Sequence, residues 1–156
     1  MNDDLAAQLP ALLPRAIAWA QGTADLALAV GAPLPEPWQA QARGVGVIEP
    51  AQIRIVSLSG PIPMPRDPEL RAAARQAGLL NPDMMGLTLG YAILIRTGAG
   101  VRVLRHECRH VAQYERAGGL EAFLPLYLGQ LVSLGYRNAP FELDAAACEA
   151  ADRPLE

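Results

Sequence analysis

Both histidines of the chain lie four residues apart, in the segment His106-Glu107-Cys108-Arg109-His110. On a helix, residues at this spacing share one face and lie one turn apart. Two neutral imidazoles placed in this way can bind one tetrahedral metal ion, and Glu107 beside them can take a proton from a water on the metal. The HExxH pattern therefore predicts a zinc-dependent hydrolase, with His106 and His110 as ligands and Glu107 as the general base.

The same segment has a plainer interpretation, in which a surface helix carries two solvated histidines. The flanking residues argue against it, because Val103, Leu104, Val111 and Ala112 continue an apolar pattern. Imidazoles buried between such positions are costly unless a partner satisfies them, and one metal ion would partner both. We therefore expect a metal site on a helix that packs against the core.

A catalytic zinc site needs a third protein ligand and an open fourth position. Glu115 lies five residues beyond His110 on the same helix, so its side chain is expected to point away from the metal. Glu142 lies in the first turn of a later helix. If the helix between them leads away from the motif and the chain then returns, Glu142 can lie opposite the two histidines. Asp144 lies in the same turn on a different face, and it is the alternative ligand.

The elements that must position these side chains predict an α+β fold with a small mixed or antiparallel sheet. Helical spacing and capping residues predict helices over 12–30, 67–77, 101–117 and 120–134, and another that begins near Asn138, its candidate cap. Apolar and β-branched runs predict strands over 53–58 and 87–96, the second as one strand of ten residues. The proline-rich segment 32–37 is expected to be a rigid, non-helical connector.

The order of these motifs resembles the gluzincin clan of zinc metallopeptidases, and more closely the small zincin-like domains of bacteria. Three segments carry the resemblance: GLTLGYAILI at 86–95, VLRHECRHVAQYE at 103–115 and YRNAPFELDA at 136–145. It covers about residues 50–148. The resemblance implies a Zn²⁺ ion held by His106, His110 and Glu142, with Glu107 as the base.

The resemblance also implies where a peptide or protein substrate would bind. In zincins the strand before the motif helix borders the cleft and pairs with an extended peptide. Residues 88–93 would take that place here, with Gly90, Tyr91 and Ala92 as the edge-strand contacts. The plainer interpretation is a buried strand with no role in binding substrate.

Two features depart from thermolysin-type relatives. Those relatives have an aspartate four residues after the ligand glutamate, which orients a ligand histidine, whereas this chain has Ala146. The partner of that histidine is therefore open, with Asp144 or a backbone carbonyl as candidates. Tyr136 is the candidate for stabilising the oxyanion, and an ordinary core tyrosine is its alternative interpretation.

Length and composition limit the classes of protein. The 156 residues, of which 51% are hydrophobic, predict one globular domain, with 1–45 as a helical extension or cap and 46–150 as the metallopeptidase-like core. A net charge of −3 with scattered basic residues gives no indication of a nucleic-acid partner. The two cysteines, the acidic start and the short apolar runs favour a cytoplasmic protein without a membrane-spanning segment.

A second hypothesis keeps the fold and the metal without the reaction. In it the chain is a catalytically weak or inactive zinc-binding module with a structural or protein-binding role. The two hypotheses differ in coordination, because a catalytic site keeps one position free, whereas a structural site is closed by a fourth protein ligand or by the N-terminal helix.

Overall fold

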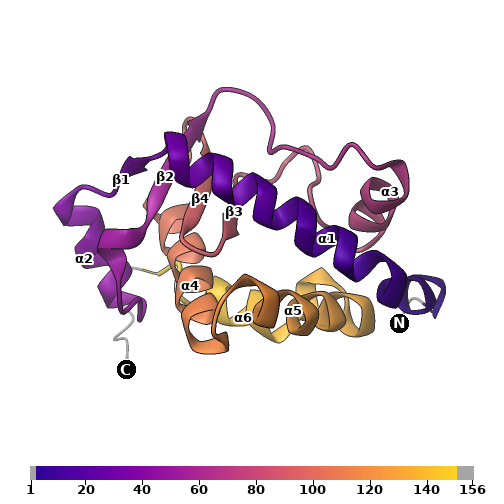
Figure 1. Ribbon diagram of the computed structural model, residues 1–156. Coiled ribbons are helices and arrows are strands. Elements are labelled where there is room, and N and C mark those ends of the chain that lie inside the picture. Colours follow the sequence, from indigo (N-terminus) through magenta and orange to yellow (C-terminus); the bar gives the residue numbers. More distant parts are fainter. Residues whose placement is uncertain (1–2, 151–156) are drawn as a thin grey trace.

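The computed structural model describes residues 3–150, and it confirms the α+β class (Figure 1). In chain order the elements are α1 (Asp3–Val30), β1 (Ala32–Pro33), α2 (Glu36–Gly44), η1 (Pro50–Gln52), β2 (Arg54–Leu58), α3 (Pro68–Gln76), β3 (Gly86–Leu89), β4 (Ala92–Arg96), α4 (Val101–Ala117), α5 (Leu120–Leu134), η2 (Tyr136–Asn138) and α6 (Pro140–Ala147). Within the described range no helix combines the length and the apolar character needed to cross a bilayer.

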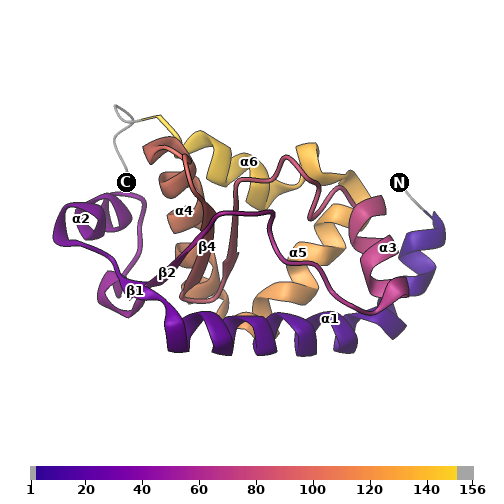
Figure 2. The same ribbon diagram turned by 90° about the horizontal axis from the view of Figure 1, so that it is seen from above.

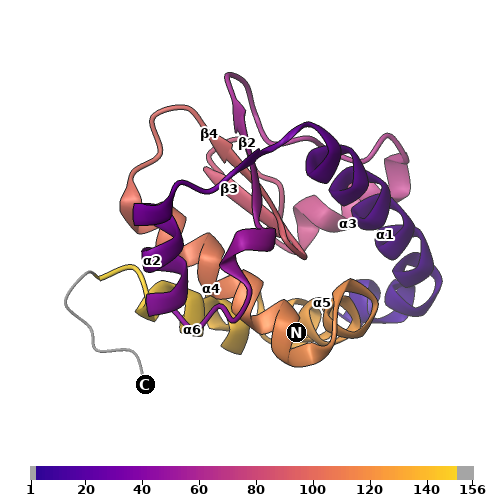
Figure 3. The same ribbon diagram turned by 60° about the vertical axis from the view of Figure 1, so that its left-hand side comes forward.

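The strands form one small mixed sheet in the order β1-β2-β4-β3. β2 runs parallel to β4, whereas β1 pairs with β2 and β3 pairs with β4 in antiparallel fashion. Because side chains alternate along a strand, Ile93 and Ile95 of β4 face the core beneath α4, and Ala92 and Leu94 face the core beneath α1. The sheet therefore lies between α1 and α4, as Figure 3 shows.

The predicted ten-residue strand at 87–96 is wrong, because it is a hairpin of β3 and β4. Gly90 adopts a φ of 65°, the left-handed region that glycine enters at no steric cost, and the chain reverses there. Ala92 then lies on an inner strand, paired with both Leu89 and Arg54. Gly90, Tyr91 and Ala92 are thus not edge-strand residues, and the hydroxyl of Tyr91 donates to Glu115 at 2.7 Å.

The first helix begins earlier than the predicted residue 12 and runs through Pro10 and Pro14. A proline inside a helix removes one backbone donor and costs about 3 kcal/mol. The two prolines are exposed, whereas Leu5 and Leu12 are buried in a cluster with residues of α3 and α5. Burial of these leucines offsets the local cost, so tertiary packing extends the helix beyond the point where its local sequence favours it.

The ends of the shorter helices follow their local chemistry. Asp67 caps α3 as predicted, since its carboxylate accepts hydrogen bonds from the backbone N–H groups of Glu69 and Leu70. The predicted cap of α6 is wrong: Ala139 occupies the cap position and Asn138 ends η2. The connector is also shorter than predicted, because α2 already begins at Glu36 with a proline in its first turn.

Candidate metal centre

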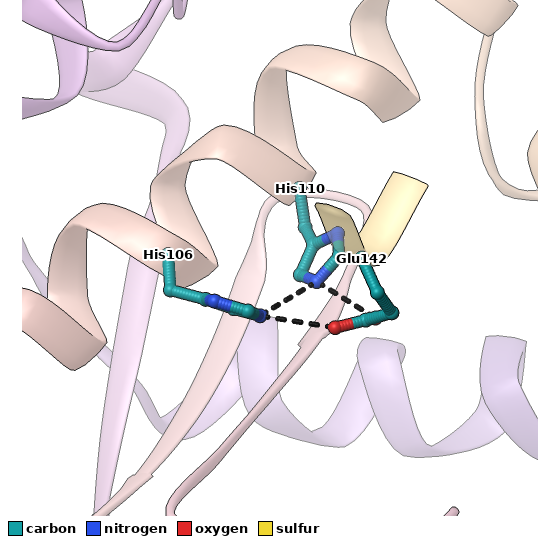
Figure 4. Close-up of side chains that lie close together, drawn as sticks. All are labelled: His106, His110 and Glu142. Atoms are coloured by element: carbon teal, nitrogen blue, oxygen red, sulfur yellow. Dashed lines mark hydrogen bonds and ion pairs between the residues drawn. The ribbon is translucent and has the colours of Figure 1, made fainter. Parts of the chain in front are cut away.

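Helix α4 carries the HExxH segment, with its two histidines on a different face from Cys108. Leu104, Cys108 and Val111 are fully buried in the core that α4 shares with β4. The helix ends at Ala117 and is followed by Gly118, whose φ of 99° gives a left-handed cap. His106 and His110 project towards α6, which brings Glu142 to them (Figure 4).

Three donor groups converge at this point: Nε2 of His106, Nε2 of His110 and the carboxylate of Glu142, here called the donor set. The two Nε2 atoms lie 3.2 Å apart. Nε2 of His106 lies 3.1 Å from Oε1 of Glu142, and Nε2 of His110 lies 3.1 Å from its Oε2. His110 and Glu142 are buried and His106 is nearly so. This is a group of side chains that can hold a metal ion.

The charges of the donor set are strongly coupled. Burial alone would raise the pKa of Glu142, but hydrogen bonds from His106 and His110 outweigh it and hold that pKa well below its ordinary value. Burial alone would lower the pKa of His110, yet the hydrogen bond to Glu142 raises it to about 9. The pKa of His106 is raised for the same reasons. A cation is therefore favoured at this place, either as protons on the imidazoles or as a metal ion.

Each histidine has an acceptor on its second ring nitrogen. Nδ1 of His106 lies 3.1 Å from Oε1 of Glu149, and Nδ1 of His110 lies 2.8 Å from Oε1 of Gln113. A proton held on Nδ1 by such an acceptor leaves Nε2 with a free lone pair, which is the form that binds metal. Glu149 and Gln113 therefore supply the orienting partners that Ala146 does not.

Asp144, the alternative ligand, lies outside the donor set. Arg109 binds it through Nε at 2.7 Å and through Nη2 at 3.2 Å. Gln113 donates to it at 2.9 Å, and the same amide donates to the carbonyl oxygen of Phe141 at 2.9 Å. Asp144 thus ties α6 to α4, and Glu142 is the residue that the structure brings to the histidines.

Two tyrosines lie beside Glu142. The hydroxyl of Tyr127 in α5 donates to Oε2 of Glu142 at 2.6 Å. Burial and the charge of Glu142 raise the pKa of Tyr127 well above its ordinary value, so the hydroxyl keeps its proton. Burial and the same charge raise the pKa of Tyr136, which lines one pocket together with Glu107, His110 and Glu142. Tyr136 is therefore present at the site, and its role towards an oxyanion stays a prediction.

Glu107 is buried and fixed by the edge strand β3. The hydroxyl of Thr88 lies 2.6 Å from Oε2 of Glu107 and 3.0 Å from its carbonyl oxygen. At Gly86, a Cβ atom would lie 2.8 Å from Cγ of Glu107 and 2.9 Å from its Oε1, so only glycine leaves room for this carboxylate. Both residues hold Glu107 in one position at the wall of the pocket.

The sequence did not indicate Glu149 or Tyr127 as parts of the site, and it placed Thr88 on a substrate-binding strand rather than against Glu107. The need of each ligand histidine for a second acceptor was a signal that could have directed attention to Glu149, an acid shortly after α6. No local pattern identifies Tyr127 or Thr88, because they reach the site only through the packing of α5 and β3. Comparisons of the chain with protein-family models, curated proteins and solved structures give no match.

Proposed function

We propose that the chain is a zinc-dependent hydrolase, a metallopeptidase of the HExxH gluzincin type. The shape of the donor set is the observation that carries the proposal. The two Nε2 atoms lie 3.2 Å apart, and each lies 3.1 Å from a different oxygen of the Glu142 carboxylate. Ligands bound to tetrahedral zinc at ~2.05 Å lie ~3.3 Å from each other, so an ion between these three groups needs only small shifts of the side chains.

The number of ligands favours a catalytic over a structural site. Among residues 3–150, no fourth histidine, cysteine, aspartate or glutamate joins the donor set. Two histidines and one carboxylate with an open fourth position form a ligand set typical of zinc hydrolases. The pocket that His110 and Glu142 line gives a substrate space beside that position.

Zinc bound here would polarise the substrate carbonyl and make water a stronger nucleophile at neutral pH. Glu107, held by Thr88, accepts the proton of the attacking water and returns it to the leaving nitrogen. The C–N bond breaks as a C–O bond forms, which gives a carboxylic acid and an amine. Tyr127 keeps Glu142 in place, while Gln113 and Glu149 keep the imidazoles in the tautomer that presents Nε2.

Metal content and turnover of the purified protein test the proposal together. The wild type is expected to hold about one equivalent of zinc and to cleave members of a quenched-fluorescent peptide library. His110→Ala removes one of three ligands and should lose both zinc and cleavage. Glu107→Gln should keep the zinc and lose cleavage, because the amide cannot accept the proton.

Glu121→Gln is the matched control, since Glu121 is an exposed acid in the first turn of α5. It should retain both zinc and cleavage. Cleavage by Glu107→Gln at the wild-type rate would contradict the role of the base. A protein that is purified without zinc and does not take it up would refute the metal site itself.

A further inference from the structure

An apolar pocket leads away from the candidate metal centre. Its walls come from α1, α3, α5 and β3, and Glu107, His110 and Glu142 lie in its lining. Figure 2 shows how α1 continues past the sheet towards α3, with α5 alongside. The N-terminal half of α1 thus forms a wall of the space that adjoins the site.

The lining of this pocket is elongated, and the pocket is here called the slot. Along α1 its lining extends from Leu5 to Ala20, which corresponds to about 22 Å of helix at the standard rise. The lining is therefore long enough along α1 for an extended chain of many atoms.

Polar side chains are confined to the metal end of the slot, and they already have partners there. Thr88 binds Glu107, Tyr127 binds Glu142, and Tyr114 donates to the carbonyl oxygen of Thr88 at 3.2 Å. The remaining walls of α1, α3 and α5 are mainly aliphatic, with residues such as Leu9, Leu12, Leu70, Ala77 and Leu131. A peptide main chain placed between these helices would leave its buried amides without hydrogen bonds, which is unfavourable.

We infer that the slot binds a long aliphatic chain, so that the substrate is an amide with a long alkyl or acyl chain beside the scissile bond. The identity of the scissile bond rests on the proposed hydrolase function, whereas the aliphatic part of the substrate is inferred from the slot alone. Each methylene that leaves water on entering the slot adds about fourfold to affinity. The metal end then receives the carbonyl group, and the aliphatic end extends along α1.

Binding of saturated carboxylates to the zinc-loaded wild type tests the inference without any need for turnover. Butanoate, octanoate and dodecanoate are titrated by calorimetry below their micelle concentrations. Affinity should rise by about fourfold per methylene until the slot is filled. The matching p-nitroanilides, assayed in parallel, should show the same order in kcat/KM.

A substitution in the wall of the slot distinguishes binding inside the slot from nonspecific binding to the protein surface. Ala16→Phe places a ring in the slot and should abolish the gain from butanoate to dodecanoate, with butanoate affinity unchanged. Ala18→Phe, on the exposed face of the same helix, is the matched control and should keep the full gain. Ala77→Phe narrows the slot from α3 and serves if Ala16→Phe does not fold.

Affinities of the wild type that do not change with chain length would overturn the inference, as would equal losses in Ala16→Phe and Ala18→Phe. Preference for leucine-containing peptides over carboxylates of equal apolar size would assign the slot to peptide side chains and also overturn it. A chain-length gain without hydrolysis of any anilide would leave the aliphatic site established and refute the proposed reaction.

Discussion

The hydrogen bond between Tyr127 and Glu142 permits a quantitative test of how the third ligand is held. Tyr127→Phe removes one hydroxyl and no carbon atom, so the aromatic packing with Phe123 remains. The lost bond measures 2.6 Å and ends on a buried carboxylate. A hydrogen bond to a charged group contributes about 1.5–3 kcal/mol.

The hydroxyl of Tyr127 holds Glu142 in its ligand position and stabilises its charged state, and the substitution removes this contact. We expect zinc affinity to fall by about 10- to 100-fold, the range typical for loss of an outer contact to a metal ligand. The measurement is competition for zinc against a fluorescent chelator at pH 7, with metal-free protein as the starting point. Circular dichroism checks that the helices are intact.

Tyr114→Phe is the control for this substitution. Tyr114 is a buried tyrosine whose hydroxyl donates to the backbone carbonyl of Thr88 and does not touch the donor set. It should destabilise the fold by about 1 kcal/mol and leave zinc affinity within about twofold of wild type. Equal zinc affinities for Tyr127→Phe and the wild type would refute the reasoning, because the hydroxyl would then contribute nothing to the position of Glu142.

Three further predictions concern the base and the protons of the site. Thr88→Val should lower kcat by about 10-fold or more with zinc retained, since a hydrogen bond to a charged group is lost, whereas Thr97→Val, at an exposed threonine, should not. Gly86→Ala forces Glu107 to move, and a 1 Å displacement can cost about 100-fold in rate; wild-type turnover in a folded, zinc-loaded variant would contradict the contact. Burial alone would lower the pKa of His110, but its hydrogen bond to Glu142 outweighs burial and raises that pKa from 6.5 to about 9. The imidazole is therefore protonated at pH 7, and it must lose this proton before it can bind metal. Zinc affinity should therefore increase by about tenfold per pH unit as pH rises towards 9 and then level off, which chelator competition at several pH values measures.

The removal of metal gives one more expected outcome. Without an ion, the donor set contributes only the contacts of His106 and His110 with Glu142. The separate contacts of Asp144 between α4 and α6 remain. A ligand that binds only the folded state stabilises it by RT ln(1 + [L]/Kd), which is about 4 kcal/mol at a thousandfold excess over Kd. Dialysis against a chelator should lower Tm, and restored zinc should recover it; an unchanged Tm would count against a metal bound tightly in the folded protein.

The sequence by itself determined those parts of the site that depend on local geometry. Two histidines at a spacing of four residues share a helix face in any α-helix, and α4 has the bounds 101–117 that its apolar pattern and the following glycines predict. Glu142 could be named, with Asp144 as the alternative, because one intervening helix can bring the next helix back alongside the first. The cap at Asp67 and the strand at 54–58 follow from local chemistry in the same way.

Only the tertiary structure decided the contacts between segments that are far apart in the chain. The hairpin at Gly90 was hidden because apolar residues continue through it, and it moved the sheet edge to β3, where Gly86 and Thr88 hold Glu107. Tyr127 and Glu149 acquire their roles from the packing of α5 and α6 against α4, for which the sequence has no periodic signal. The path of α1 through two prolines, and the slot that it lines, depend on leucines buried against α3 and α5, since long-range burial there outweighs the local preference of the backbone.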